Sequence, residues 1–250
     1  MKKSVSVYEV IFLAIFLPIS SFSLSKDCEK DKDNLKVLRS SWIDEDLAFL
    51  DGRKEVGYFF ENNSVNYSIY EEGALIGVVR SDPFYQEEVD RGNELISHLN
   101  TYIDLKLNSV TRRHQADLVI IGVCEDSDTT GMVADNEFGD QYYLLLNGCN
   151  GVLDIDGEPE LLFLHELGHA LGLEHPFDDT DGDCLYSNRP FGRDSTDTSV
   201  TVMAYKSSKS LVGFFTDLDL ATLQSIHGVA DGAPKNFLIE RNEKPEGEID

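Results

Sequence analysis

The chain has 250 residues, and 41% of them are hydrophobic, which is enough for a substantial core in one large domain or two small ones. The formal net charge is −25 at pH 7. An acidic surface of this strength repels phosphate backbones, so we expect no nucleic-acid partner. Solubility is the simplest role of the acidity, and steering toward basic partners is the alternative.

The first 25 residues have the pattern of a secretory signal peptide. Lys2 and Lys3 precede an apolar run from Val10 to Ile19, and small serines follow this run. An apolar run of this length is too short to span a bilayer. We therefore expect cleavage after Ser23 or Ser25, no stable membrane anchor and a secreted protein, with the periplasm as the alternative location.

The rest of the chain divides into three parts by composition. Residues 26–55 are rich in charge, and we interpret them as an N-terminal arm or a short pro-segment. Residues 56–230 contain the apolar runs that predict a main domain. Residues 231–250 are polar and acidic, which predicts a tail.

Strand and helix patterns follow one another along the main domain. Residues 65–70 alternate at the period of a strand, and Ser81-Asp82-Pro83 can cap an amphipathic helix of about 20 residues that continues to Ile103. Further strands are predicted at residues 105–107, 117–123, 131–135 and 141–147, of which 131–135 reads as an edge strand. This order indicates an α/β fold with a mostly parallel sheet.

Residues 161–175 carry the chemistry of the chain, and most of them belong to a predicted helix. Pro159 suits its first turn and Gly172 its end. His165 and His169 are four residues apart, so on a helix their imidazoles project from one face and can bind one ion.

Gly172 also tolerates positive φ, which lets the chain turn sharply so that His175 can return as a third ligand. Three imidazoles leave one position of a tetrahedral Zn²⁺ site open for a water, whose pKa the metal lowers to about 7. Glu166 stands beside the first histidine and is the candidate base. Ordinary polar residues on an amphipathic helix are the alternative, but three of the six histidines lie in residues 165–175.

The region after this helix predicts an acidic loop and then a last helix. Four aspartates surround Gly182, and Ca²⁺ prefers six to eight oxygen ligands. The spacing lacks a later bidentate glutamate, so a solvated loop is favoured and a Ca²⁺ site is the alternative. Residues 216–226 have the pattern of a helix that begins with Thr216 as its cap and ends before Gly228.

Four cysteines follow the predicted signal: Cys28, Cys124, Cys149 and Cys184. An even number in an exported chain predicts two disulfide bonds, with three pairings open. Buried free thiols are the alternative. Zinc ligation by cysteine is disfavoured because the chain has no Cys-x-x-Cys spacing.

The pattern His-Glu-x-x-His-x-x-Gly-x-x-His at residues 165–175, followed by Thr201-Val202-Met203-Ala204-Tyr205, resembles the metzincin zinc metalloproteases. In that clan a long zinc motif precedes a Met-turn. Pro176 and the residues around Met203 look most like the serralysin and matrixin type of catalytic domain. The resemblance extends loosely from Val65 to Gly228, and it does not include the C-terminal calcium-binding repeats of serralysins.

The resemblance implies an α+β fold. Its expected features are a twisted, mostly parallel five-stranded sheet with an antiparallel edge strand, two long helices, a zinc helix and a C-terminal helix after the Met-turn. Residues 132–135 would be the edge strand that holds a peptide by strand addition, whereas a solvated hairpin is the alternative.

The resemblance also implies roles for single residues. Met203 would form an apolar floor beneath the histidines, and Tyr205 would be a catalytic residue that can bind zinc at rest and swing toward the oxyanion. The strands at 117–123 and 141–147 would be parallel neighbours. That arrangement implies a Cys124–Cys149 disulfide and leaves Cys28 to pair with Cys184.

The predicted function is a secreted zinc endopeptidase that hydrolyses protein or peptide substrates. Glu166 would activate the metal-bound water while zinc polarises the scissile carbonyl. The alternative is a zinc-holding interaction module that binds proteins without cleaving them, and the presence of Glu166 favours the enzyme. Cleavage preference and oligomeric state do not follow from the sequence.

Overall fold

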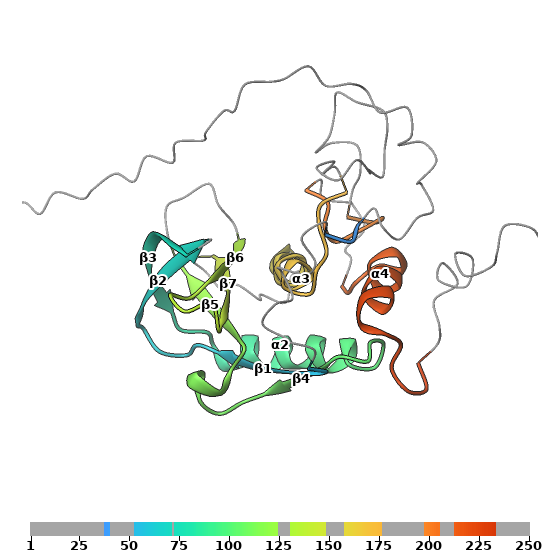
Figure 1. Cartoon of the computed structure of the whole chain (residues 1–250), viewed down its shortest axis with the longest axis horizontal. Coiled ribbons are helices and arrows are strands. Elements are labelled where there is room, and N and C mark those ends of the chain that lie inside the picture. Colours follow the sequence, from blue (N-terminus) through green and yellow to red (C-terminus); the bar gives the residue numbers. More distant parts are fainter. Residues whose placement is uncertain are drawn as a thin grey trace, which may run out of the picture.

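The computed structural model describes residues 38–40, 53–71, 73–124, 131–148, 158–176, 198–205 and 213–233. The predicted signal peptide, the acidic loop around Gly182 and most of the predicted tail lie outside these ranges. Within them, seven strands form one mixed sheet that packs against three α-helices (Figure 1).

Three strands precede the first of these helices along the described chain, and the other elements follow it. The strands are β1 (Glu55–Phe60), β2 (Asn66–Glu71), β3 (Ala74–Asp82), β4 (Lys106–Ser109), β5 (Leu118–Val123), β6 (Gly131–Asp135) and β7 (Tyr142–Asn147). The helices are α2 (Gln86–Leu99), α3 (Glu158–Ala170) and α4 (Asp217–His227), with a short 3-10 helix η3 (Arg113–Gln115).

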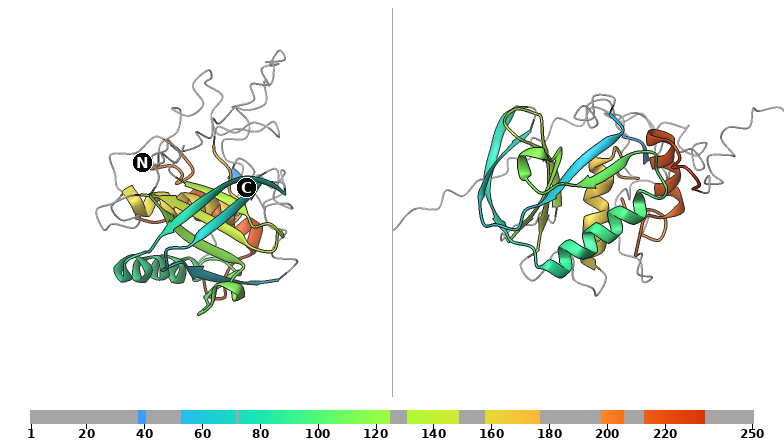
Figure 2. Two further views of the ribbon diagram at one scale, coloured as in Figure 1. Left: turned by 90° about the vertical axis from the view of Figure 1, so that its left-hand side faces the viewer. Right: turned by 90° about the horizontal axis from the view of Figure 1, so that it is seen from below.

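Five of the strands close into a barrel. The order across the sheet is β3-β2-β6-β7-β5-β1-β4, and β3 also pairs with β5 through Ser81 and Val123. Strand β5 is parallel to β1 and β7, β1 is parallel to β4, and β6 is antiparallel to β7. Strands β1 and β4 therefore extend the sheet beyond the barrel and support α2 (Figure 2).

The fold expected from the metzincin resemblance is wrong. The sheet has seven strands and closes on itself, whereas five strands in an open sheet were expected. Strand β6 is not an edge, because it lies between β7 and β2, so strand addition along residues 132–135 loses its basis. Helix α2 has 14 residues, fewer than the length of about 20 that was expected for it.

The physical reason for the error lies in the segment between β1 and α2. Residues 74–82 form an extra strand, β3, that leaves Leu75 and Val78 more than half exposed, so it lacks the alternation typical of a strand. Asp82 ends β3 and does not cap the helix. Helix α2 instead begins after Tyr85, whose backbone N–H donates to the Glu88 carboxylate at 2.7 Å.

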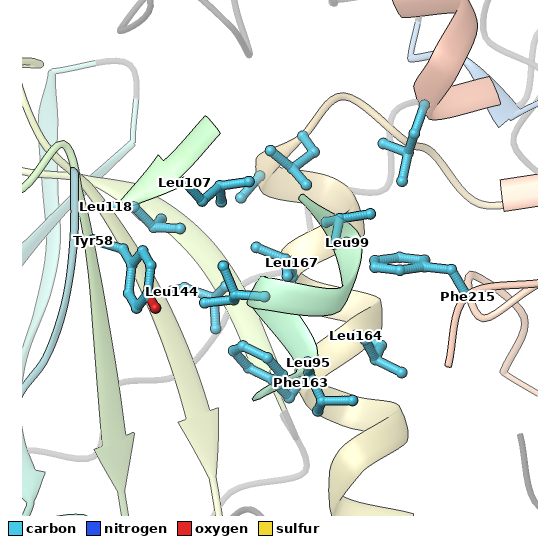
Figure 3. Close-up of a cluster of buried hydrophobic side chains, with 14 of the residues drawn as sticks. Tyr58, Leu95, Leu99, Leu107, Leu118, Leu144, Phe163, Leu164, Leu167 and Phe215 are labelled. Carbon is cyan, nitrogen blue, oxygen red and sulfur yellow. The ribbon is translucent and has the colours of Figure 1, made fainter. Parts of the chain in front are cut away.

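Two apolar cores flank the sheet. One fills the barrel between β2, β5, β6 and β7, and includes Tyr67, Val119 and Ile121. The larger one lies between the sheet, α2, α3 and α4, where side chains of α2 and α3 point toward one another beside Phe215, which precedes α4 (Figure 3). Phe163 and Leu167 of α3 are fully buried there, and each is worth about 1.5–3 kcal/mol of transfer free energy. This burial fixes the rotation of α3.

An ion pair fixes the start of α3 against α2. Arg91 donates from Nε and Nη2 to the two oxygens of Glu160, at 2.6 and 3.0 Å. Glu160 is 6% exposed, and the bidentate bonds raise the pKa of Arg91. The helix that carries the histidines is thus held by a directional contact as well as by its apolar side chains.

Cys124 directly follows β5 and is disulfide-bonded. The other three cysteines lie outside the residues that the structure describes, so the pairing of Cys124 with Cys149 stays a prediction. In the described part of the chain, no helix is both long and apolar enough to cross a membrane.

Candidate metal centre

The side chains of His165, His169 and His175 converge at one point. One ligand nitrogen from each lies within 4.8 Å of the others, which is close enough to hold a metal ion. The two Nε2 atoms of His169 and His175 are 3.1 Å apart. Two nitrogens on a tetrahedral zinc ion would be about 3.3 Å apart, so the donor set fits such an ion.

The outer nitrogens of two of these imidazoles bond to backbone carbonyls. Nδ1 of His165 lies 2.8 Å from the carbonyl oxygen of Val202, and Nδ1 of His169 lies 2.9 Å from that of Leu173. A carbonyl can only accept, so Nδ1 carries the proton and Nε2 keeps its lone pair. This is the tautomer that a metal ligand needs.

Burial keeps the same imidazoles neutral. It lowers the pKa of His165, and burial together with the neighbouring His165 lowers the pKa of His169 to about 4. A metal competes with protons for imidazole, so a lowered pKa favours metal binding at neutral pH.

A tight turn brings His175 back toward α3. Gly172 has φ of 91°, and the N–H groups of Gly172 and Leu173 donate to the carbonyls of His169 and Gly168 at 3.0 and 2.9 Å. These two bonds form a Schellman motif, which requires a positive φ at the glycine. The helix ends at Ala170, and the turn at Gly172 redirects the chain so that His175 lies beside His169.

Two distant segments hold this turn. Leu38–Ser40 lies antiparallel to it: Ser40 N–H donates to the Gly172 carbonyl and Glu174 N–H to the Leu38 carbonyl, both at 3.0 Å. Leu38 is fully buried. From the other side, Nε2 of His227 in α4 lies 2.9 Å from the carbonyl oxygen of Leu171.

Met203 lies against the backbone of α3 between the two helical histidines. It is fully buried, and a Cβ built on Gly168 would lie only 2.6 Å from its sulfur. The glycine therefore lets the methionine approach the helix closely.

Asp219 organises the segment that contacts His165. Its carboxylate is fully buried and accepts from Thr201 Oγ1 at 2.5 Å, Val202 N–H at 3.0 Å, Thr216 N–H at 2.9 Å and Thr216 Oγ1 at 2.8 Å. Burial raises the pKa of this carboxyl, and the donors oppose the rise. Sequence reasoning found only the capping bond with Thr216, because the contact with residues 201–202 has no local signal.

Glu166 and Tyr205 complete the candidate site. Glu166 is buried, and this burial raises its pKa to about 8 in the metal-free protein. The ring of Tyr205 is 49% exposed, with its centroid 4.6 Å from that of His175 and 5.7 Å from that of His165. Tyr205 therefore lies beside the histidines at the solvent side of the site.

No protein-family model matches the chain, and no curated protein matches it significantly.

Replacing Asp219 by asparagine should weaken both the fold and metal binding. Asparagine offers one acceptor oxygen where the carboxylate has two, and its amide faces groups that are themselves donors. Hydrogen bonds to charged groups are worth about 1.5–3 kcal/mol each, so we expect the unfolding free energy to fall by roughly 3 kcal/mol. Urea denaturation measures this loss, and zinc affinity should fall because Val202 no longer fixes His165.

The matched control is Asp217→Asn, in the exposed part of the same helical turn. It should cost less than about 1 kcal/mol, the usual value of an acidic group near a helix N-terminus. Equal stability of Asp219→Asn and the wild type would contradict this role.

His169 should make the metal-free protein less stable as the pH falls from about 6.5 toward 4, a contribution opposite in sign to that of Glu166, whose pKa is raised. In this window an unfolded histidine binds a proton, whereas His169, with its pKa of about 4, does not. The unfolded state is then favoured by up to roughly 3 kcal/mol. Urea denaturation at a series of pH values should show this loss as the difference in slope between the wild type and His169→Gln, because the Glu166 contribution is common to both proteins. Identical slopes for both proteins would rule the explanation out.

Proposed function

We propose that the chain is a secreted zinc-dependent endopeptidase. The observation that carries this proposal is the convergence of His165, His169 and His175, with the Nδ1 atoms of the first two bonded to backbone carbonyls. The likeness of residues 165–175 and 201–205 to the motifs of metzincins supports it at the level of the site. The disulfide bond at Cys124 supports an oxidising compartment outside the cytosol.

The donor set favours zinc. Three imidazoles close enough to hold one ion, with no Cys, Asp or Glu joining their group in the described residues, are typical of catalytic zinc sites. A zinc ion bound there would polarise the scissile carbonyl and lower the pKa of a bound water.

Glu166 is the proposed general base. Its buried carboxyl follows the first ligand in the chain and has its pKa raised to about 8 by burial alone. A cation at the histidines would favour the carboxylate again, since opposite charges stabilise each other. In that form Glu166 takes the proton of the attacking water and transfers it to the leaving amine.

Tyr205 is the proposed donor to the oxyanion. Its ring lies beside His175 while nearly half of its surface is exposed, so the side chain can turn without disturbing the core. The phenol can donate one hydrogen bond to the negatively charged oxygen of the tetrahedral intermediate.

Casein hydrolysis should be abolished by a chelator and restored by zinc, and Glu166→Gln should lower kcat about 10²- to 10⁴-fold. The substitution removes the base and no ligand, so zinc content and urea stability should stay near wild type. Hydrolysis and metal content are measured on the same preparation.

Glu87→Gln, which removes an equal charge from the exposed first turn of α2, is the control and should keep wild-type activity. Strong hydrolysis by folded, zinc-loaded Glu166→Gln protein would remove Glu166 from the mechanism. A wild-type protein that binds zinc and partners but cleaves nothing would favour the interaction module.

Tyr205→Phe should lower kcat with little change in KM, because the hydroxyl acts only as the oxyanion forms. We expect a fall of about 10²-fold or less, the lower end for such a donor. Zinc affinity should change little, since three histidines remain. Tyr85→Phe, at another exposed tyrosine, serves as the control. Wild-type kcat would show that Tyr205 only packs, and loss of zinc would make it a structural ligand.

A further inference from the structure

Gly131, the first residue of β6, lies directly against the side chain of Glu166. A Cβ built on Gly131 would lie 2.6 Å from both Cδ and Cγ of Glu166, and nearer still to Oε1. Real Cβ atoms do not approach other heavy atoms this closely. Any other residue at position 131 would therefore occupy the space that the Glu166 side chain fills.

The closest contacts of a side chain at position 131 would be with Glu166. The three heavy atoms nearest to the Cβ position all belong to Glu166. The backbone conformation is no obstacle, because Gly131 is not among the glycines with positive φ. Its backbone is one that an L-residue can adopt, so the contact is the feature that requires glycine.

The backbones on both sides of this contact are held in place. Gly131 pairs with Leu146 of β7, which is fully buried. Glu166 lies in α3 beside Leu167, which is also fully buried. A methyl group at position 131 would therefore move the Glu166 side chain, since neither the strand nor the helix can withdraw without opening the core.

We propose that Gly131 is a positioning residue for Glu166: the bare backbone of β6 leaves the space that sets where the carboxylate lies. This proposal rests on the proposed function. The position of the Glu166 carboxylate is thus restrained by a contact between β6 and α3 that involves none of the three histidines. A misplacement of about 1 Å in a catalytic group can cost on the order of 10²-fold in rate.

Gly131→Ala tests the catalytic consequence. Its kcat for peptide hydrolysis should fall on the order of 10²-fold, while KM and zinc affinity stay near wild type, because the histidines do not move. Gly77→Ala in β3 is the matched control: that glycine has open space around it and no positive φ. The control should keep wild-type kcat. A wild-type kcat for Gly131→Ala would overturn the proposal.

A double-mutant cycle on the metal-free protein tests the contact without any activity. Gly131→Ala should lower the urea midpoint when Glu166 is present and should not lower it in the Glu166→Ala background, where the space is vacant. An equal loss in both backgrounds would overturn the proposal. If the wild type cleaves no peptide but the cycle shows this coupling, the proposed function fails and the positional restraint stands.

Discussion

The buried carboxylate of Asp219 connects helix α4 to the segment that contacts His165 in the candidate metal centre. Asp219 receives hydrogen bonds from Thr201, Val202 and Thr216, and the carbonyl of Val202 in turn accepts from His165. A buried charge costs several kcal/mol unless donors surround it, so this carboxylate is stable only when residues 201–202 and α4 take this one arrangement. Helix α4 contributes no ligand, yet its two ends hold the Val202 segment and the turn after α3.

Helix α3 lies between the barrel and the larger apolar core. Strands β6 and β7 contact one side of the helix, and the core shared with α2 and α4 covers the other (Figure 1). Because the barrel has an apolar core of its own, the position of strands β6 and β7 does not depend on α3. The helix therefore packs against a surface that is already defined, and the ion pair between Arg91 and Glu160 selects its position along that surface.

Features with local sequence signals could be predicted, and those that depend on distant contacts could not. The spacing of His165 and His169, the stop at Gly172 and the cap at Thr216 each follow from a few neighbouring residues. The closure of the barrel depends on Ser81 meeting Val123, and no local pattern reports that contact. Strand β1 alternates between buried and partly buried residues after its exposed first residue, but it precedes the part of the chain that the family resemblance covers.

The turn after α3 is held by Leu38 near one end of the described chain and by His227 near the other, 227 − 38 = 189 positions apart. Synthesis at about 5–20 residues per second separates these two residues by roughly 10 to 40 s. Only the last 227 − 175 = 52 positions follow His175, so the nascent chain contains the histidine motif without all of α4 for roughly 3 to 10 s of that interval. The candidate metal centre therefore lacks the support of α4 until almost the whole described domain has been synthesised.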